Sequence, residues 1–288
     1  MGYSGRYHAT SLIAVFLALA IGILIGAEFG GDALTGTRKD LERSLVGNLE
    51  DARSQAEQLN GELGHANEFS ERVYPVLTRD RLEGMRIGLL GIGHLPSDAT
   101  GAVEQALAPT GAQLVAVGVV REPVDVDGLA EDLAKTRFFD LRTNPDQLTA
   151  LGRGLGRQLM IGGVLPEVVR SHLFSHTSGG FGRLDGVIVV RSQPQDMGPV
   201  QRARANQLEA ALMEGIAGTR TPRVGVETLS AEPSSISFFQ GSDMTSVDDV
   251  DQAAGQLAMV FALLGAEGSF GVKGSADRLL PELLAPEG

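Results

Sequence analysis

The apolar run from Thr10 to Ala27, TSLIAVFLALAIGILIGA, constrains this chain more than any other feature. It carries no charge, and its only polar side chains, Thr10 and Ser11, stand at its edge. About 18 uncharged, mostly apolar residues suffice for a helix to cross the hydrocarbon core of a bilayer, where a helix satisfies its own backbone hydrogen bonds. We therefore predict a short N-terminal tail over residues 1–9, a transmembrane anchor over residues 10–30, and nearly all of the chain on one side of the membrane.

Two other interpretations of the run stay open. A cleaved signal peptide also has an apolar run after a basic residue such as Arg6, although that run usually spans about 7–15 residues before a small-residue cleavage site. Ile25-Gly26-Ala27 is a passable site of this kind. A buried core helix would have to be apolar on every face. A lipid-modified anchor is excluded because the chain contains no cysteine.

Small residues recur along one face of the predicted anchor. They follow a spacing of four residues, at Ala14, Ala18, Gly22, Gly26 and Gly30. Such a face lets two membrane helices approach closely, so it predicts helix pairing and a homodimer. The alternative is that Gly and Ala are simply frequent in membrane helices.

The composition excludes several classes of binding partner, but it does not fix the orientation of the predicted anchor in the membrane. The formal net charge of −12 argues against binding to nucleic acid or to an anionic lipid surface. The absence of cysteine removes disulfides, zinc–thiolate sites and cysteine nucleophiles. Basic residues flank the anchor on both sides, with Arg6 before it and Arg38, Lys39 and Arg43 after it. Since large domains translocate largely regardless of charge, the orientation stays open on this evidence.

A stalk is predicted over residues 34–77. Its apolar residues alternate steps of four and three, as in a heptad seam that pairs helices in a coiled coil, at Leu45, Leu49, Ala52, Ala56, Leu59, Leu63 and Ala66. Gly61 and Gly64 weaken the helix by about 1 kcal/mol each relative to Ala, and Pro75 is expected to end or kink it. The alternative is a single amphipathic helix packed on its own domain.

An α/β domain is predicted over residues 84–266, with a mainly parallel sheet and crossover helices. The expected strands are 85–90, 113–120, 187–190 and 223–227, and the expected helices are 99–107, 129–135, 145–159, 200–216 and 251–264. Gly152, Gly154 and Gly156 should loosen the third helix. Residues 175–182 are expected to form a loop, 233–245 a loop or edge hairpin, and 267–288 a loose C-terminal tail.

No motif in the chain indicates an enzyme. Gly91 and Gly93 follow the first strand, but Pro96 stands where a dinucleotide-binding G-x-G-x-x-G motif needs its third glycine, so a plain turn is favoured. Neither a P-loop nor a G-x-S-x-G elbow is present. We therefore predict no catalytic residue and no cofactor.

Metal-binding residue types are present without a convincing pattern. His172 and His176 are one helical turn apart, but no glutamate accompanies them as in H-E-x-x-H. Five methionines could offer thioethers to Cu(I) but stand at apolar helix positions typical of a core, namely Met160, Met197, Met213, Met244 and Met259. Asp248, Asp249 and Asp251 precede the last helix, where carboxylates are expected to cap free N–H groups. No metal ligand is predicted.

Two stretches resemble an actinobacterial family of copper transporters, the MctB family. The first is Tyr7–Gly26 with its preceding Arg6, similar to the family's R-x-H-x-x-S-L-x-A-V-F-L-A-L-A-x-G opening, and the second is the Ser246–Asp251 segment that runs into Gly255–Leu263. The resemblance implies a single-pass protein of the cell membrane whose C-terminal domain is extracytoplasmic. It also implies a link to copper efflux or homeostasis at the cell envelope, with a copper ion as the candidate ligand.

Two functional hypotheses follow from the resemblance. The first is a membrane-anchored copper transporter family protein; because one helix cannot enclose a pore, transport would need oligomers or partners. The second is a scaffold similar to SteB, whose coiled coil would dock an envelope or cell-division protein. An enzyme is the least favoured alternative.

Overall fold

The structure is a computed structural model. It describes the backbone of residues 5–282 and the side chains of residues 10–26 and 44–282. The chain divides into two compact units, Met1–Ala66 and Asn67–Gly288. The predicted N-terminal tail, the end of the predicted anchor at residues 27–30 and the last residues, 283–288, lie outside the described side chains.

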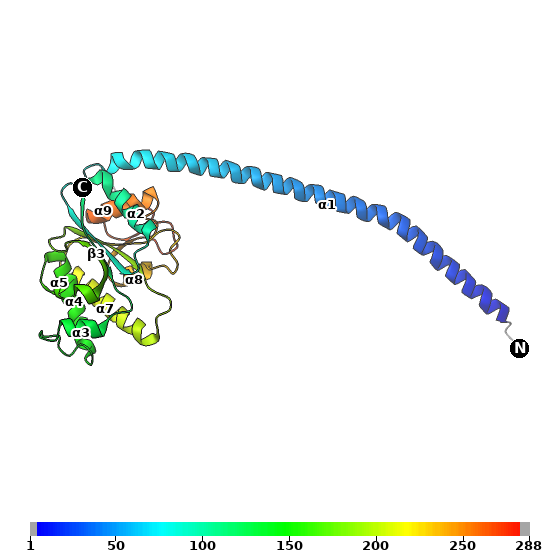
Figure 1. The fold of residues 1–288 in the computed structure, drawn as a ribbon. Coiled ribbons are helices and arrows are strands. Elements are labelled where there is room, and N and C mark those ends of the chain that lie inside the picture. Colours follow the sequence, from blue (N-terminus) through cyan, green and yellow to red (C-terminus); the bar gives the residue numbers. More distant parts are fainter. Residues whose placement is uncertain (1–4, 283–288) are drawn as a thin grey trace. The chain divides into compact units, whose positions relative to one another are not determined.

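The first unit consists of most of helix α1 (Gly5–Thr78), which is continuous through the predicted anchor and stalk (Figure 1). Its described apolar side chains are exposed, including Phe16 at 64% and Leu24 at 70%. A Cβ atom added at Gly22 or Gly26 would meet nothing within 4 Å; Gly30 lies outside the described side chains. Within the described part of the chain, no helix combines the length and apolar character that a membrane crossing requires.

The predicted coiled-coil seam is also exposed on this single helix. Leu45, Leu49, Leu59 and Leu63 are each 55–60% exposed, and Ala52, Ala56 and Ala66 are exposed as well. Pairing through this seam therefore stays a prediction. Pro75 lies inside α1, which ends three residues later at Thr78.

The second unit is the α/β domain, and its mainly parallel sheet with interleaved helices confirms the α/β part of the predicted fold class. The strands are β1 (Arg86–Gly93), β2 (Gln113–Val120), β3 (Phe174–Gly179), β4 (Gly186–Ser192), β5 (Arg223–Val226), β6 (Thr245–Val247) and β7 (Ser269–Phe270). The helices are α2 (Ser97–Leu107), η1 (Ala108–Thr110), α3 (Val126–Asp132), α4 (Pro145–Ile161), α5 (Leu165–Val168), α6 (Arg170–Leu173), α7 (Pro199–Ala217), α8 (Ile236–Gly241) and α9 (Ala253–Leu263). The sheet order is β3-β2-β1-β4-β5-β6-β7, and only the β2–β3 pair among these strands is antiparallel.

Helices cover both faces of the sheet, so the central strands are apolar on both sides, as parallel strands require. In β4, Val187 and Val189 pack in the core beneath α4 and α7, whereas Ile188 and Val190 pack in the core beneath α2 and α9. Figure 1 shows α2 and α9 on one side of the strands and α3, α4 and α7 on the other. The end of α1 joins the α2–α9 core through Tyr74, whose hydroxyl donates to the Ala106 carbonyl oxygen at 2.6 Å.

Three sequence predictions for this domain are wrong. The predicted loop 175–182 begins as β3, an edge strand whose polar side chains face solvent while its backbone pairs with β2. The predicted loop or hairpin 233–245 contains α8, which buries Phe239 completely. The glycines of α4 do not interrupt it, since the helix is continuous over Pro145–Ile161. Cβ atoms at Gly152 and Gly156 would overlap Ala211 and Leu212 of α7, so these two glycines let α4 pack closely against α7.

The end of the domain also differs from expectation. Residues 267–288 are predicted as a loose tail, yet β7 adds a buried strand to the sheet through Ser269 and Phe270. The aspartates before α9 do not cap it, because the N-cap residue is Gln252 and it makes no side-chain capping bond. Asp248 instead accepts hydrogen bonds from the backbone of Val272 and Lys273, at 2.9 and 3.1 Å.

Candidate functional site

The candidate site lies at the carboxyl ends of β1 and β4, where the strand order reverses. From β1 the chain moves outward to β2, and from β4 it moves to β5 on the other side. In open α/β sheets, ligands bind in the crevice that such a reversal leaves at the carboxyl edge. A cavity of about 300 Å³ occupies this position. We call it the switch-point cavity.

Three segments supply the walls of the switch-point cavity. The start of α2 contributes Pro96, Asp98 and Ala99; β4 and the chain after it contribute Val190, Arg191, Ser192, Gln193, Gln195 and Arg202; the chain after β5 contributes Glu227, Thr228, Ser230, Ala231, Glu232, Pro233 and Ser235. The segments meet because β1, β4 and β5 are neighbours in the sheet and their following loops leave from the same edge. The volume is at the lower end of the range for small-molecule sites, about 300–1,000 Å³.

A buried ion pair forms one side of the site. Arg191 Nε donates to Glu209 Oε2 on α7 at 2.6 Å, and the Gln193 amide donates to the other oxygen of the same carboxylate. Glu209 is only 2% exposed. The Arg191 guanidinium also lies 4.4 Å from the centroid of the Phe238 ring. This arrangement fixes the Arg191 side chain at the cavity wall.

Glu122, just beyond the end of β2, lies against this ion pair. Both of its carboxylate oxygens are buried, and no described residue donates a hydrogen bond to either of them. Burial, followed by the hydrogen bond and the negative charge of Glu209, raises the pKa of Glu122 to about 9. This raised pKa favours the protonated form of Glu122, whose carboxyl O–H would supply the donor that two carboxylates lack.

Gly93, at the end of β1, leaves room for the Glu122 side chain. A Cβ atom at Gly93 would lie 2.9 Å from Glu122 Oε2 and would overlap the Ser192 carbonyl oxygen. Gly93 also has a φ of +78°, which side chains rarely adopt. The turn expected after this strand is thus present, and the close approach to Glu122 explains why glycine occupies it.

A second buried ion pair closes the opposite side. Glu227, 3% exposed, accepts from Lys273 Nζ at 2.6 Å, from the Ser234 hydroxyl at 2.8 Å and from the Ser235 backbone N–H at 2.6 Å. The Lys273 ammonium also donates to the Thr228 carbonyl oxygen at 3.1 Å. Lys273 thereby ties the C-terminal segment to the loop after β5.

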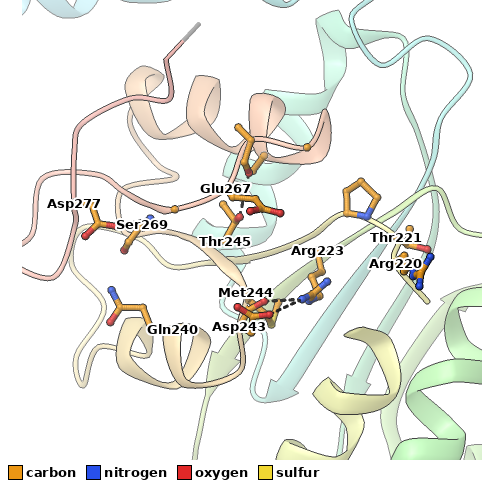
Figure 2. A pocket seen from close by; sticks show the side chains of 15 residues that line it. Arg220, Thr221, Arg223, Gln240, Asp243, Met244, Thr245, Glu267, Ser269 and Asp277 are labelled. Atoms are coloured by element: carbon orange, nitrogen blue, oxygen red, sulfur yellow. Dashed lines mark hydrogen bonds and ion pairs between the residues drawn. The ribbon is translucent and has the colours of Figure 1, made fainter. Parts of the chain in front are cut away.

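A second cavity, of about 490 Å³, lies at the opposite edge of the sheet, at the amino ends of β5, β6 and β7. Figure 2 shows Arg223 beside Asp243 in this cavity; Arg223 Nη2 donates to the Asp243 carbonyl oxygen at 2.7 Å and lies 3.6 Å from its carboxylate. Gln240 is engaged with the Ser275 carbonyl oxygen. Because ligands of parallel α/β sheets bind at the carboxyl edge, the smaller switch-point cavity is the better candidate.

The structure does not bring the histidines together at a metal site. His172 lies on α6, where its Nδ1 is 2.8 Å from Asp132 Oδ2, and this hydrogen bond raises the pKa of His172. His176 lies on β3, outside that helix. In the part of the chain that the structure describes, no group of three or more His, Asp or Glu residues could hold a metal ion.

The methionines are core residues. Their exposed fractions are 7% or less for Met160, Met197, Met213, Met244 and Met259. Met160, Met213, Met244 and Met259 pack in the two apolar cores, as expected of core methionines. The expected helix positions are wrong for Met197 and Met244, which lie in the chain before α7 and before β6.

Sequence reasoning missed the charged residues of the site. Glu122 and Arg191 follow directly or almost directly after the apolar strands LVAVGVV and VIVV. A charged residue at the end of each of these two parallel strands could have indicated the site, because the carboxyl ends of parallel strands meet at one edge of the sheet. Glu209 and Lys273 gave no comparable signal.

Comparison with known proteins assigns the family. A family model described as "Copper transport outer membrane protein, MctB" matches residues 3–281. The chain belongs to the MctB family. MctB-family relatives include the protein called copper transporter MctB of Mycobacterium tuberculosis (strain ATCC 25618 / H37Rv), which is 29% identical over 123 residues. The protein of the same name from Mycobacterium leprae (strain TN) is 30% identical over 123 residues.

These alignments are partial: each covers 42% of this chain and 39% of the relative. The description of the MctB family and the names of these relatives concern copper transport, and none of them names an enzyme.

Proposed function

We propose that this MctB-family protein acts in copper efflux or copper homeostasis at the cell envelope. The observation that carries the proposal is the family match over residues 3–281. The apolar run Thr10–Ala27 would hold the protein in the membrane as a single span, with the α/β domain on the extracytoplasmic side. No described residue is assigned to copper, because the candidate thioethers are core groups.

The protein would act as an assembly. One helix cannot enclose a pore, so transport requires further copies or a partner. The exposed leucines of α1, with Leu49, Leu59 and Leu63 at 55–59% exposure, form a heptad seam that would pair two copies. The same seam supports the second candidate function, a SteB-like scaffold whose coiled coil docks an envelope or cell-division protein.

The test is complementation of a strain that lacks the gene. The full-length protein should restore copper tolerance, lower the cellular copper content and be recovered in the membrane fraction. A triple change, Leu49→Ser, Leu59→Ser and Leu63→Ser, should abolish the dimer in detergent and the rescue. The matched control, Asp51→Ser and Gln58→Ser, alters exposed positions outside the seam and should preserve both.

The outcomes separate the candidates. Unchanged copper content in the deletion strain, together with a division defect that the seam variant fails to rescue, would replace the copper role by the scaffold. Recovery of a mature protein lacking residues 10–27 in the soluble fraction would refute the anchor.

A further inference from the structure

The charges around the switch-point cavity do not balance in its interior. Arg191 is neutralised by Glu209, and Lys273 by Glu227. Arg202, which is half-buried in the cavity wall, has no carboxylate partner among the described residues. Its Nη2 donates only to backbone carbonyl oxygens, those of Gln195 at 3.1 Å and Met197 at 3.4 Å. A guanidinium held in this way keeps its full charge and retains donors for a ligand.

The first turn of α2 lies against the same cavity. Pro96, Asp98 and Ala99 at the start of this 11-residue helix line the cavity, and the N-cap residue makes no side-chain capping bond. The helix dipole favours an anion at such an end, although Asp98 Oδ1 already accepts from the Ala99 backbone N–H at 2.9 Å. Arg202 belongs to the first turns of α7 and lines the same cavity, so the guanidinium and the start of α2 border one space.

The negative groups around the cavity are positioned differently. Asp98 and Glu232 are exposed and lie at its rim, where solvent and salt screen their effect. Hydroxyl and amide groups also line the cavity, on Ser192, Ser230 and Gln195. This combination suits one anionic group in the interior and neutral hydroxyl groups near the mouth.

We propose that the switch-point cavity binds a small organic anion, a carboxylate or phosphate monoester that carries hydroxyl groups. The anionic group contacts the Arg202 guanidinium and the first turn of α2, and the hydroxyl groups contact the serine and glutamine side chains. The cavity of about 300 Å³ limits the ligand to a small molecule. This site does not depend on the proposed copper role.

The proposal is tested by calorimetric titration of the full-length protein in detergent. The probes are glycerol 3-phosphate and gluconate, with glycerol and glucose as their neutral counterparts. At least one anion should bind at millimolar concentration or below, and its neutral counterpart should not bind. Binding by the phosphate alone or by the carboxylate alone identifies which anionic group the cavity selects.

Variants assign the binding to the cavity. Arg202→Gln should weaken binding about tenfold or more, whereas Arg204→Gln, an exposed position of α7 outside the cavity lining, should leave the affinity unchanged. Arg202→Lys should retain part of the affinity because it retains the charge. Asp98→Asn should strengthen binding by removing a rim carboxylate.

Thermal unfolding without ligand shows whether the Arg202→Gln variant is folded, and Arg202→Lys provides the comparison if it is not. The proposal is overturned if neither anion binds at millimolar concentration, if glycerol or glucose binds as tightly as its anion, or if the folded Arg202→Gln variant binds like the wild type.

Discussion

Replacing Glu122 by glutamine should abolish a specific pH dependence of the stability of the α/β domain. In the folded protein, burial and the neighbouring Glu209 raise the pKa of Glu122 from an ordinary value of 4.5 to about 9. Between these two values the folded state holds one proton that the unfolded state has released. Stability is therefore fully present below the unfolded pKa and is lost as the pH rises through the folded pKa.

The magnitude follows from the single proton. A difference of one bound proton changes the free energy of unfolding by about 1.4 kcal/mol per pH unit. Between pH 5.5 and 7.5 the wild type should thus lose up to about 3 kcal/mol through Glu122. This slope depends on the proton count and needs only that the folded pKa lies above the window. With a typical urea dependence of about 1–3 kcal/mol per molar, the denaturation midpoint falls by about 1–3 M.

Glu122→Gln imitates the protonated carboxyl, since its amide N–H can donate to Glu209 at every pH. Urea unfolding of the full-length wild type and variant, followed by circular dichroism at several pH values, measures the difference between them. Titrations shared by both proteins, such as those of His172 and Asp249, cancel. The wild type should become less stable relative to the variant as the pH rises. Parallel stability profiles would refute the assignment of a buried, protonated Glu122.

Three further predictions concern other buried groups. Asp249 is 1% exposed, neither of its carboxylate oxygens has a hydrogen-bond partner among the described residues, and burial raises its pKa to about 6. Asp249→Asn should therefore raise the free energy of unfolding at pH 7.5 by up to about 3 kcal/mol, and this gain should vanish near pH 4. Equal stabilisation at both pH values would contradict the prediction. Lys273→Met should cost about 3 kcal/mol of unfolding free energy because it leaves the Glu227 carboxylate buried without its cation; adding Glu227→Gln should recover much of the loss in a double-mutant cycle. Tyr74→Phe should cost about 1 kcal/mol by removing the hydrogen bond to Ala106, and denaturation no different from wild type would show that this bond is not stabilising.

The order of secondary structure could be read from the sequence because it depends on local periodicity. The strand 113–120 was predicted with its observed bounds, and the apolar core of β4 was identified from Val187–Val190. Strands alternating with helices indicate a parallel sheet, since parallel strands need long crossover connections. Length and apolarity also single out Thr10–Ala27 without reference to any other part of the chain.

Features that depend on neighbours distant in sequence could not be predicted in this way. Gly156 weakens an isolated helix, but beside the Leu212 carbonyl oxygen it permits close helix packing. The polar strand β3 is stabilised by its pairing with β2, which its composition does not encode.

The candidate site shows the same limit most clearly. Glu122, Arg191 and Glu209 are separated by up to 87 positions, from 122 to 209, and meet because β2, β1 and β4 lie next to one another under α7. The sequence by itself determined the residue types and the elements that carry them. The tertiary structure decided which charges share a buried volume, and because a pKa depends on burial and on nearby charges, it also decided that the pKa of Glu122 is raised.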